Sequence, residues 1–76
     1  MNAHNWIAIE AFHGFESWGL QLANGTFCLV SFDREYPEMG WRASYRKPAD
    51  PTTHYLDRFN DKTTAMTRVI EQASEP

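Results

Sequence analysis

The chain has 76 residues, a formal net charge of -3 and 14% aromatic residues. A chain this short buries only about 60% of its unfolded surface when it folds, so one helix layer on one sheet is the realistic limit. The net charge has the wrong sign for a general nucleic-acid binder, and the apolar runs are far shorter than the roughly 20 residues of a membrane-spanning helix. We therefore expect one soluble, compact domain over residues 1–76, with frayed ends at residues 1–5 and 75–76.

A first strand is predicted at residues 6–12, where the side chains alternate between two sets that would face opposite sides. A short amphipathic helix is the alternative for this segment, because alanine, isoleucine and glutamate do not exclude one. Gly14 is expected in the turn that follows.

The strongest local signal is the dipeptide Asn24-Gly25, which lies between two alternating apolar segments. It predicts a two-residue type I′ turn, because Asn and Gly best tolerate the positive φ that this turn needs. The turn would join strands at residues 17–23 and 26–32.

A two-residue turn fixes the pairing of the two strands. It places Leu22 opposite Phe27 and Leu20 opposite Leu29, with Trp18 on the same side. We expect this side of the hairpin to be the core. The opposite side carries Gly19, Gln21, Cys28, Val30 and Phe32.

That second side of the hairpin is more apolar than solvent alone would favour. Two copies of the chain could bury its Cys28, Val30 and Phe32, or could pair an edge strand across a two-fold axis. A homodimer is therefore a possible assembly.

The carboxy-terminal half begins with a polar connection at residues 33–40, followed by a strand at residues 41–46 that has one basic face. Residues 47–53 contain two prolines and are expected to form a surface loop. A last strand is predicted at residues 54–59.

The period then changes to that of a helix, which Asn60 or Asp61 can cap. The apolar stripe of this helix consists of Ala65, Met66, Val69, Ile70 and Ala73. We therefore predict an α+β fold, a small antiparallel β-meander of three to five strands with one C-terminal α-helix packed on one face.

The sequence predicts no catalytic, cofactor-binding or metal-binding residue. Cys28 lies mid-strand, where a cysteine is more often a small buried hydrophobe than a reactive thiolate. His4, His13 and His54 lack the spacing of a zinc site, and no phosphate-binding glycine loop or nucleophile elbow is present. We therefore expect a protein that is not an enzyme, and a lone cysteine fits a reducing cytoplasm.

The connection at residues 33–40 combines anchor side chains with carboxylates that can steer a partner. A protein with a basic surface, including one that normally binds nucleic acid, is the natural counterpart. The expected partner-binding residues are Asp33, Glu35, Tyr36, Glu38 and Met39.

The strand at residues 41–46 offers an alternative, the binding of single-stranded nucleic acid, because rings stack on bases and arginines pair with phosphates. In a strand, however, the two rings point to one face and the two arginines to the other. Direct nucleic-acid binding is therefore the second choice. Its residues are Trp41, Arg42, Tyr45, Arg46 and Lys47.

Small size, negative charge and the lack of catalytic motifs favour a non-catalytic protein-binding module. Compact domains of this kind are common among phage-encoded inhibitors of bacterial machinery, anti-CRISPR proteins included. By this analogy of size and charge, we expect an inhibitor or regulator that occludes a surface of a bacterial nucleic-acid-handling protein. It would act in the host cytoplasm without a cofactor or a membrane.

Overall fold

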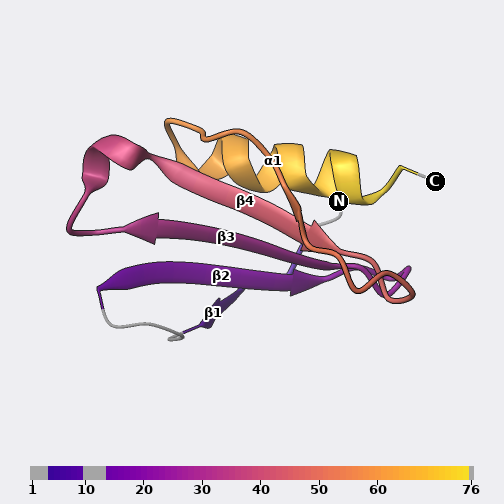
Figure 1. Ribbon diagram of the computed structural model, residues 1–76. Coiled ribbons are helices and arrows are strands. Elements are labelled where there is room, and N and C mark those ends of the chain that lie inside the picture. Colours follow the sequence, from indigo (N-terminus) through magenta and orange to yellow (C-terminus); the bar gives the residue numbers. More distant parts are fainter. Residues whose placement is uncertain (1–3, 10–13, 76) are drawn as a thin grey trace.

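The computed structural model describes residues 4–9 and 14–75, which form an antiparallel sheet with one helix on one side (Figure 1). The five strands follow one another in chain order across the sheet. The elements are β1 (Ile7–Ile9), β2 (Phe15–Gln21), β3 (Phe27–Asp33), the 3-10 turn η1 (Pro37–Met39), β4 (Trp41–Arg46), β5 (His54–Tyr55) and α1 (Lys62–Ala73). The predicted α+β meander with one C-terminal helix is confirmed.

The two edge strands of the sheet differ from the prediction in what the structure describes. Residues 7–9 of the first predicted strand are in β1, which rules out the helical alternative there, and residues 10–12 lie outside the described part. The last strand pairs with β4 at Tyr55, and a separate bridge joins Phe59 to Trp41. One residue more lies between these two pairings on the last segment than on β4, which is the arrangement of a β-bulge.

The turn between β2 and β3 differs from the predicted two-residue turn. The Leu22 N–H donates to the Thr26 carbonyl and the Gly25 N–H donates to the Leu22 carbonyl, each at 2.9 Å, so the loop has three residues. Gly25 has a φ of 89°, but Asn24 does not have positive φ, which a type I′ turn requires. Asn24 acts through its side chain instead, because its Oδ1 accepts a hydrogen bond from the Thr26 N–H at 2.9 Å.

The longer loop shifts the β2–β3 register by one position. Leu20 pairs with Cys28 instead of Leu29, and the predicted pairing of Leu22 with Phe27 is likewise absent. Because successive side chains point to opposite faces, the shift turns every β3 side chain over relative to the prediction. The prediction that Phe27 and Leu29 belong to the core is therefore wrong.

The other β3 side chains, which the prediction left uncovered, lie under the helix. Cys28 and Val30 are 0% exposed, and the Phe32 ring stacks on Trp41 with 4.8 Å between ring centroids. Cys28 and Val30 are therefore not accessible to a second copy of the chain, whereas Phe32 is half-buried. Pairing of an edge strand between two copies stays a prediction.

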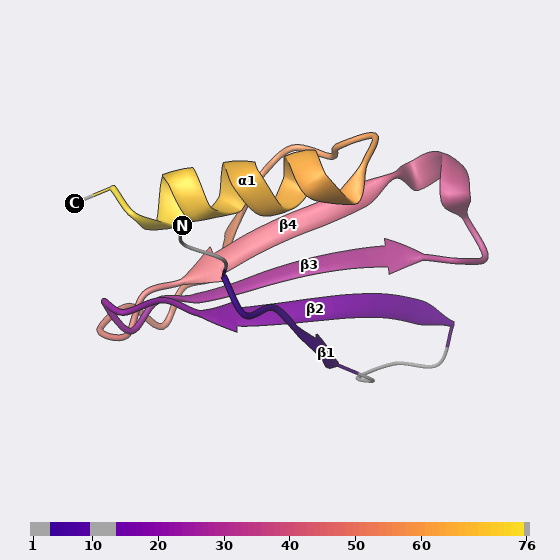
Figure 2. The ribbon, with the colours of Figure 1, turned by 180° about the vertical axis from the view of Figure 1, so that it is seen from behind.

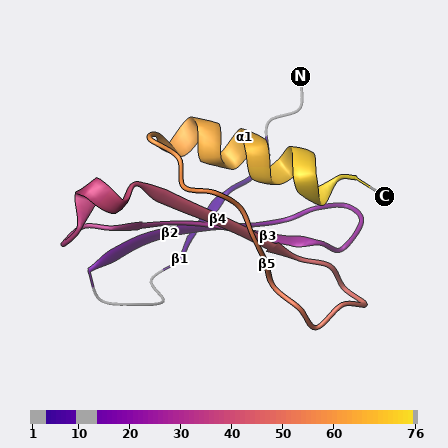
Figure 3. The ribbon, with the colours of Figure 1, turned by 45° about the horizontal axis from the view of Figure 1, so that its top comes forward.

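Helix α1 runs along β4 and covers the part of the sheet that β3 and β4 form (Figures 2 and 3). Its cap is Asp61, one of the two predicted residues, whose Oδ2 accepts a hydrogen bond from the Thr64 N–H at 2.8 Å. The stripe residues Ala65, Val69 and Ala73 are 0% exposed, so they make the tightest contact with the sheet. Within the described residues, no helix is long and apolar enough to cross a membrane.

Candidate binding surface on the open sheet face

The face of the sheet that is turned away from α1 has no described helix over it, and we call it the open face (Figure 3). Strand pairing arranges its side chains in rows that cross the sheet, because directly paired residues point to the same side. One row is Ile7, Gly19, Leu29, Ser44 and Tyr55. The rows beside it are Ile9, Ser17, Ser31 and Arg42, and Gln21, Phe27 and Arg46.

Large apolar side chains remain in solvent on and beside the open face. Ile7 is 67% exposed, Phe27 41%, Tyr55 79%, and Tyr36 of the adjoining loop 56%. These four side chains are spread over the face and the adjoining loop, from the β1 edge to the β5 edge.

A glycine lets two apolar side chains of the open face, Ile9 and Phe27, lie against the sheet. A Cβ on Gly19 would collide with Cδ1 of Ile9 and would lie 2.9 Å from Cζ of Phe27. Both side chains therefore pack over the Gly19 backbone and cover the sheet at that position.

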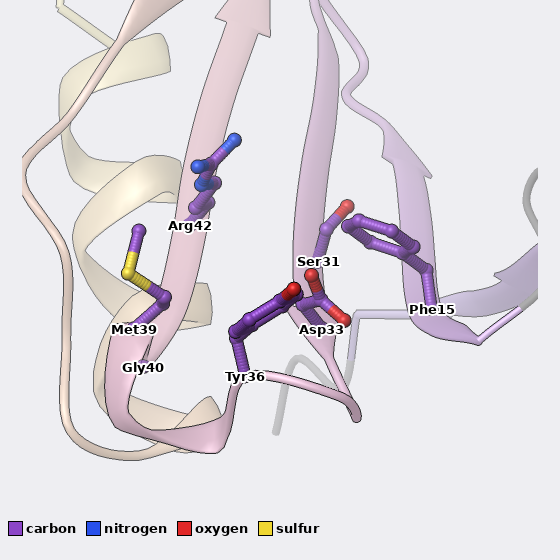
Figure 4. Close-up of a pocket in the computed structure, with 7 residues that line it drawn as sticks. All are labelled: Phe15, Ser31, Asp33, Tyr36, Met39, Gly40 and Arg42. Atoms are coloured by element: carbon purple, nitrogen blue, oxygen red, sulfur yellow. The ribbon is translucent and has the colours of Figure 1, made fainter.

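One end of the open face is hollowed where β2, β3 and β4 meet the connection between β3 and β4 (Figure 4). The hollow has a volume of about 380 Å³. Phe15 comes from the start of β2, Arg42 from β4, and Tyr36 and Met39 from the connection. The lining residues are Phe15, Ser31, Asp33, Tyr36, Met39, Gly40 and Arg42.

Local turn chemistry places the connection beside the hollow. Pro37 opens the 3-10 turn η1, and the Met39 N–H donates to the Tyr36 carbonyl at 2.9 Å. Gly40 ends the turn with a φ of 71°, a conformation that a residue with a Cβ rarely adopts. The turn thus directs Tyr36 and Met39 to the two sides of the same opening.

Some polar groups of the hollow already have hydrogen-bond partners, and others have none among the described residues. Oδ1 of Asp33 accepts from the Glu35 N–H at 3.0 Å, and the hydroxyls of Ser31 and Ser17 lie 3.2 Å apart. The Arg42 guanidinium has no hydrogen bond or ion pair in the described part of the chain. It is the group in the hollow that is most available to an anionic or accepting ligand.

The predicted partner-binding residues divide into two groups. Asp33, Tyr36 and Met39 line the hollow, whereas Glu35 and Glu38 are exposed on the connection outside it. Neither of these two glutamates forms a salt bridge with a described residue. The hollow therefore lies next to two free carboxylates.

The residues of the nucleic-acid alternative lie on two faces, as strand alternation requires. Trp41 stacks on Phe32 below the helix, and Tyr45 stacks on His54 with 5.1 Å between ring centroids. Arg42 and Arg46 point to the open face, as their pairing with Ser31 and Phe27 shows. Lys47 donates from Nζ to the Glu75 carbonyl at 3.0 Å. Rings that are to stack on bases beside these arginines must come from other residues.

Sequence reasoning missed four side chains of this surface. Phe15 lies before the predicted start of its strand, and Ser31 carried no signal of its own. Phe27 was assigned to the core because of the register error, and Tyr55 was assigned no role. A three-residue loop with glycine in its last position is the next most common hairpin connection after a two-residue loop. A prediction based on that loop would have placed Phe27 on the open face.

Cys28 lies on the helix side and does not contribute to the open face. Burial raises the pKa of its thiol to about 11, so the thiolate form is rare at neutral pH. Among the described residues no cluster of three His, Cys, Asp or Glu side chains could hold a metal ion. The described part of the open face and its hollow presents aromatic rings, carboxylates and guanidinium groups.

Comparison with known proteins gives no match: no family model, no curated protein and no solved structure matches this chain.

Proposed function

We propose that this chain is a non-catalytic protein-binding module that docks a partner at the hollow and at the connection beside it. The observation that carries the proposal is the approach of Tyr36, Met39 and Phe15 around one opening. Aromatic residues and methionine are enriched at protein interfaces, where a central pocket that takes an anchor side chain supplies most of the binding energy.

The free carboxylates of Glu35 and Glu38 stand outside the hollow and support a partner with a basic rim. Exposed charges at the edge of an interface raise the association rate and select the partner more than they raise the affinity. The partner would therefore insert an apolar side chain into the hollow and place lysines or arginines against the two glutamates.

A bacterial nucleic-acid-handling protein has such a basic surface, because it must attract phosphates. Occlusion of that surface would make the chain an inhibitor or regulator, and a phage-encoded anti-defence or anti-CRISPR-type inhibitor is the specific form that we propose. It would act in the cytoplasm of the bacterial host. Neither a cofactor nor an enzymatic step is part of this proposal.

A pull-down from bacterial lysate with the tagged protein would identify the partner, and titration of the purified partner would then test the site. The double variant Glu35→Lys/Glu38→Lys should lose binding, because like charges would face each other. Tyr36→Ala should weaken binding about tenfold or more, as an anchor residue does.

The matched control is Glu71→Lys/Glu75→Lys, which makes the same charge change on and just after α1. This control should bind as the unchanged protein does. The proposal fails if no stoichiometric partner is captured, or if binding survives the reversal of Glu35 and Glu38.

A further inference from the structure

We propose that the part of the open face along β4 binds single-stranded nucleic acid, with Arg42 and Arg46 on phosphates and the exposed rings of Phe27 and Tyr55 on bases. This activity goes beyond the docking of a protein partner at the hollow. It also assigns the stacking role to different rings from those of the predicted alternative, because Trp41 and Tyr45 lie on the helix side.

Two arginines with no described partner lie on one line. Arg42 and Arg46 are exposed, and neither has a hydrogen bond or an ion pair within the described residues. They lie four residues apart on β4, which places their Cα atoms about 13 Å apart on the same face. In a chain of net charge -3, two free guanidinium groups on one side of a sheet form a local cationic track.

Aromatic rings border this track on both sides. Phe27 of β3 pairs directly with Arg46 and is 41% exposed, and Tyr55 of β5 pairs with Ser44 and is 79% exposed. Stacking on an exposed ring suits any base, because every base has a π-face. The two aromatic rings and the two arginine side chains therefore lie along the same strip of the open face.

Between the two arginines, the β4 residue on the open face is Ser44, which pairs with Leu29 and Tyr55. Ser44 is small and only 8% exposed, so β4 presents no large side chain between Arg42 and Arg46 on this face. Serine hydroxyl groups such as that of Ser31 can donate to or accept from a base edge. An unpaired strand suits this strip better than a duplex, because stacking on Phe27 and Tyr55 needs base faces that a duplex keeps stacked inside.

The acidic connection limits how far a strand can extend. Asp33 and Arg42 both line the hollow, and Glu35 and Glu38 follow Asp33 in the chain. Their carboxylates repel phosphates, so the bound strand would end at Arg42 and would cover about four nucleotides, the low end for a small sheet domain.

Fluorescence anisotropy with labelled oligonucleotides of about 12 nucleotides, one of DNA and one of RNA, tests the proposal. Binding should weaken as salt rises from about 20 to about 200 mM, with a slope of log K against log salt of about -1.4 for two phosphates on a single strand. Arg42→Gln and Arg46→Gln should each reduce the slope by about 0.7.

Tyr55→Ala separates stacking from charge. It should weaken binding roughly 5- to 150-fold and leave the salt slope unchanged. Tyr55 is so exposed that its removal should not unfold the protein, whereas Phe27→Ala also removes packing over Gly19 and requires a folding check. The matched charge control is Arg68→Gln on the outer face of α1, which should bind like the unchanged protein.

Lack of binding at the lowest salt would overturn the proposal, as would an equal loss in Arg68→Gln. Equal affinity for an oligoglutamate peptide would also overturn it, because the track would then recognise negative charge alone. The double variant Glu35→Lys/Glu38→Lys should bind the oligonucleotide more tightly and lose the protein partner. The two proposals can therefore fail independently.

Discussion

The Nζ of Lys62 lies over the ring of Trp18, 4.6 Å from the ring centroid. The same ammonium is 3.7 Å from Oε2 of Glu16, and that oxygen also accepts a hydrogen bond from Nε1 of Trp18 at 2.8 Å. The first residue of α1 is thus tied to β2, although the helix packs mainly on β3 and β4. This contact helps to keep α1 on its side of the sheet and leaves the open face free.

Removal of the Lys62 charge should weaken this contact and lower the unfolding free energy moderately. Lys62→Met keeps most of the aliphatic stem and removes the charge, so we expect a loss of about 0.5–1 kcal/mol in unfolding free energy. Urea titration followed by tryptophan fluorescence would measure it. Arg68→Met, which removes an exposed pair with Glu71, should change stability less, and an equal effect would count against the ring contact.

At Thr26, a substitution should stabilise the protein instead of destabilising it. Its side chain is 1% exposed, and Oγ1 finds no hydrogen-bond partner among the described residues. A buried hydroxyl without a partner costs desolvation energy, so Thr26→Val should raise the unfolding free energy by about 1 kcal/mol. Thr26→Ser keeps the hydroxyl, loses a methyl group and should be less stable than the unchanged protein. A loss of stability in Thr26→Val would mean that the hydroxyl has a partner, such as a bound water.

The architecture could be predicted because its signals are local. The alternation at residues 41–46 matches β4, and the predicted cap and stripe match α1. Register was harder, since it depended on whether Asn24 would take positive φ or use its side chain to hold the Thr26 N–H. Local sequence favours positive φ at Asn24. In the structure Asn24 uses its side chain instead, and the resulting three-residue loop reverses the faces of β3.

The candidate site could be predicted only in part, for a related reason. Asp33, Tyr36 and Met39 are close in sequence, so their common loop marked them together. Phe15 and Arg42 join them only through strand pairing, because β2, β3 and β4 must first be in register. A sequence read without the correct register therefore finds the loop and misses the hollow.

Gly40 should be the least replaceable residue of the hollow. Its φ is 71°, and a Cβ there would lie 2.6 Å from the Phe59 carbonyl oxygen, which belongs to the backbone and cannot rotate away. Gly40→Ala should therefore lower the unfolding free energy by about 2 kcal/mol or more. Gly14→Ala is the matched control, because Gly14 has a φ of 85° but, among the described residues, its Cβ would meet only the Glu35 side chain at 3.5 Å. Equal losses in the two variants would show that the backbone contact adds nothing.

Cys28 reports directly on whether the helix stays over the sheet. Its pKa of about 11 and its full burial predict that about one thiol in a thousand is ionised at pH 8 and that none is accessible, so a thiol reagent should react only after unfolding. The ordinary pKa of 9.0 in the unfolded chain is lower than in the folded protein. The unfolded state therefore loses its proton first, and stability should fall as the pH rises from about 9 towards 11. Cys28→Ala should abolish this part of the pH dependence. Rapid labelling of the native protein at pH 8 would show that α1 does not cover β3 in solution.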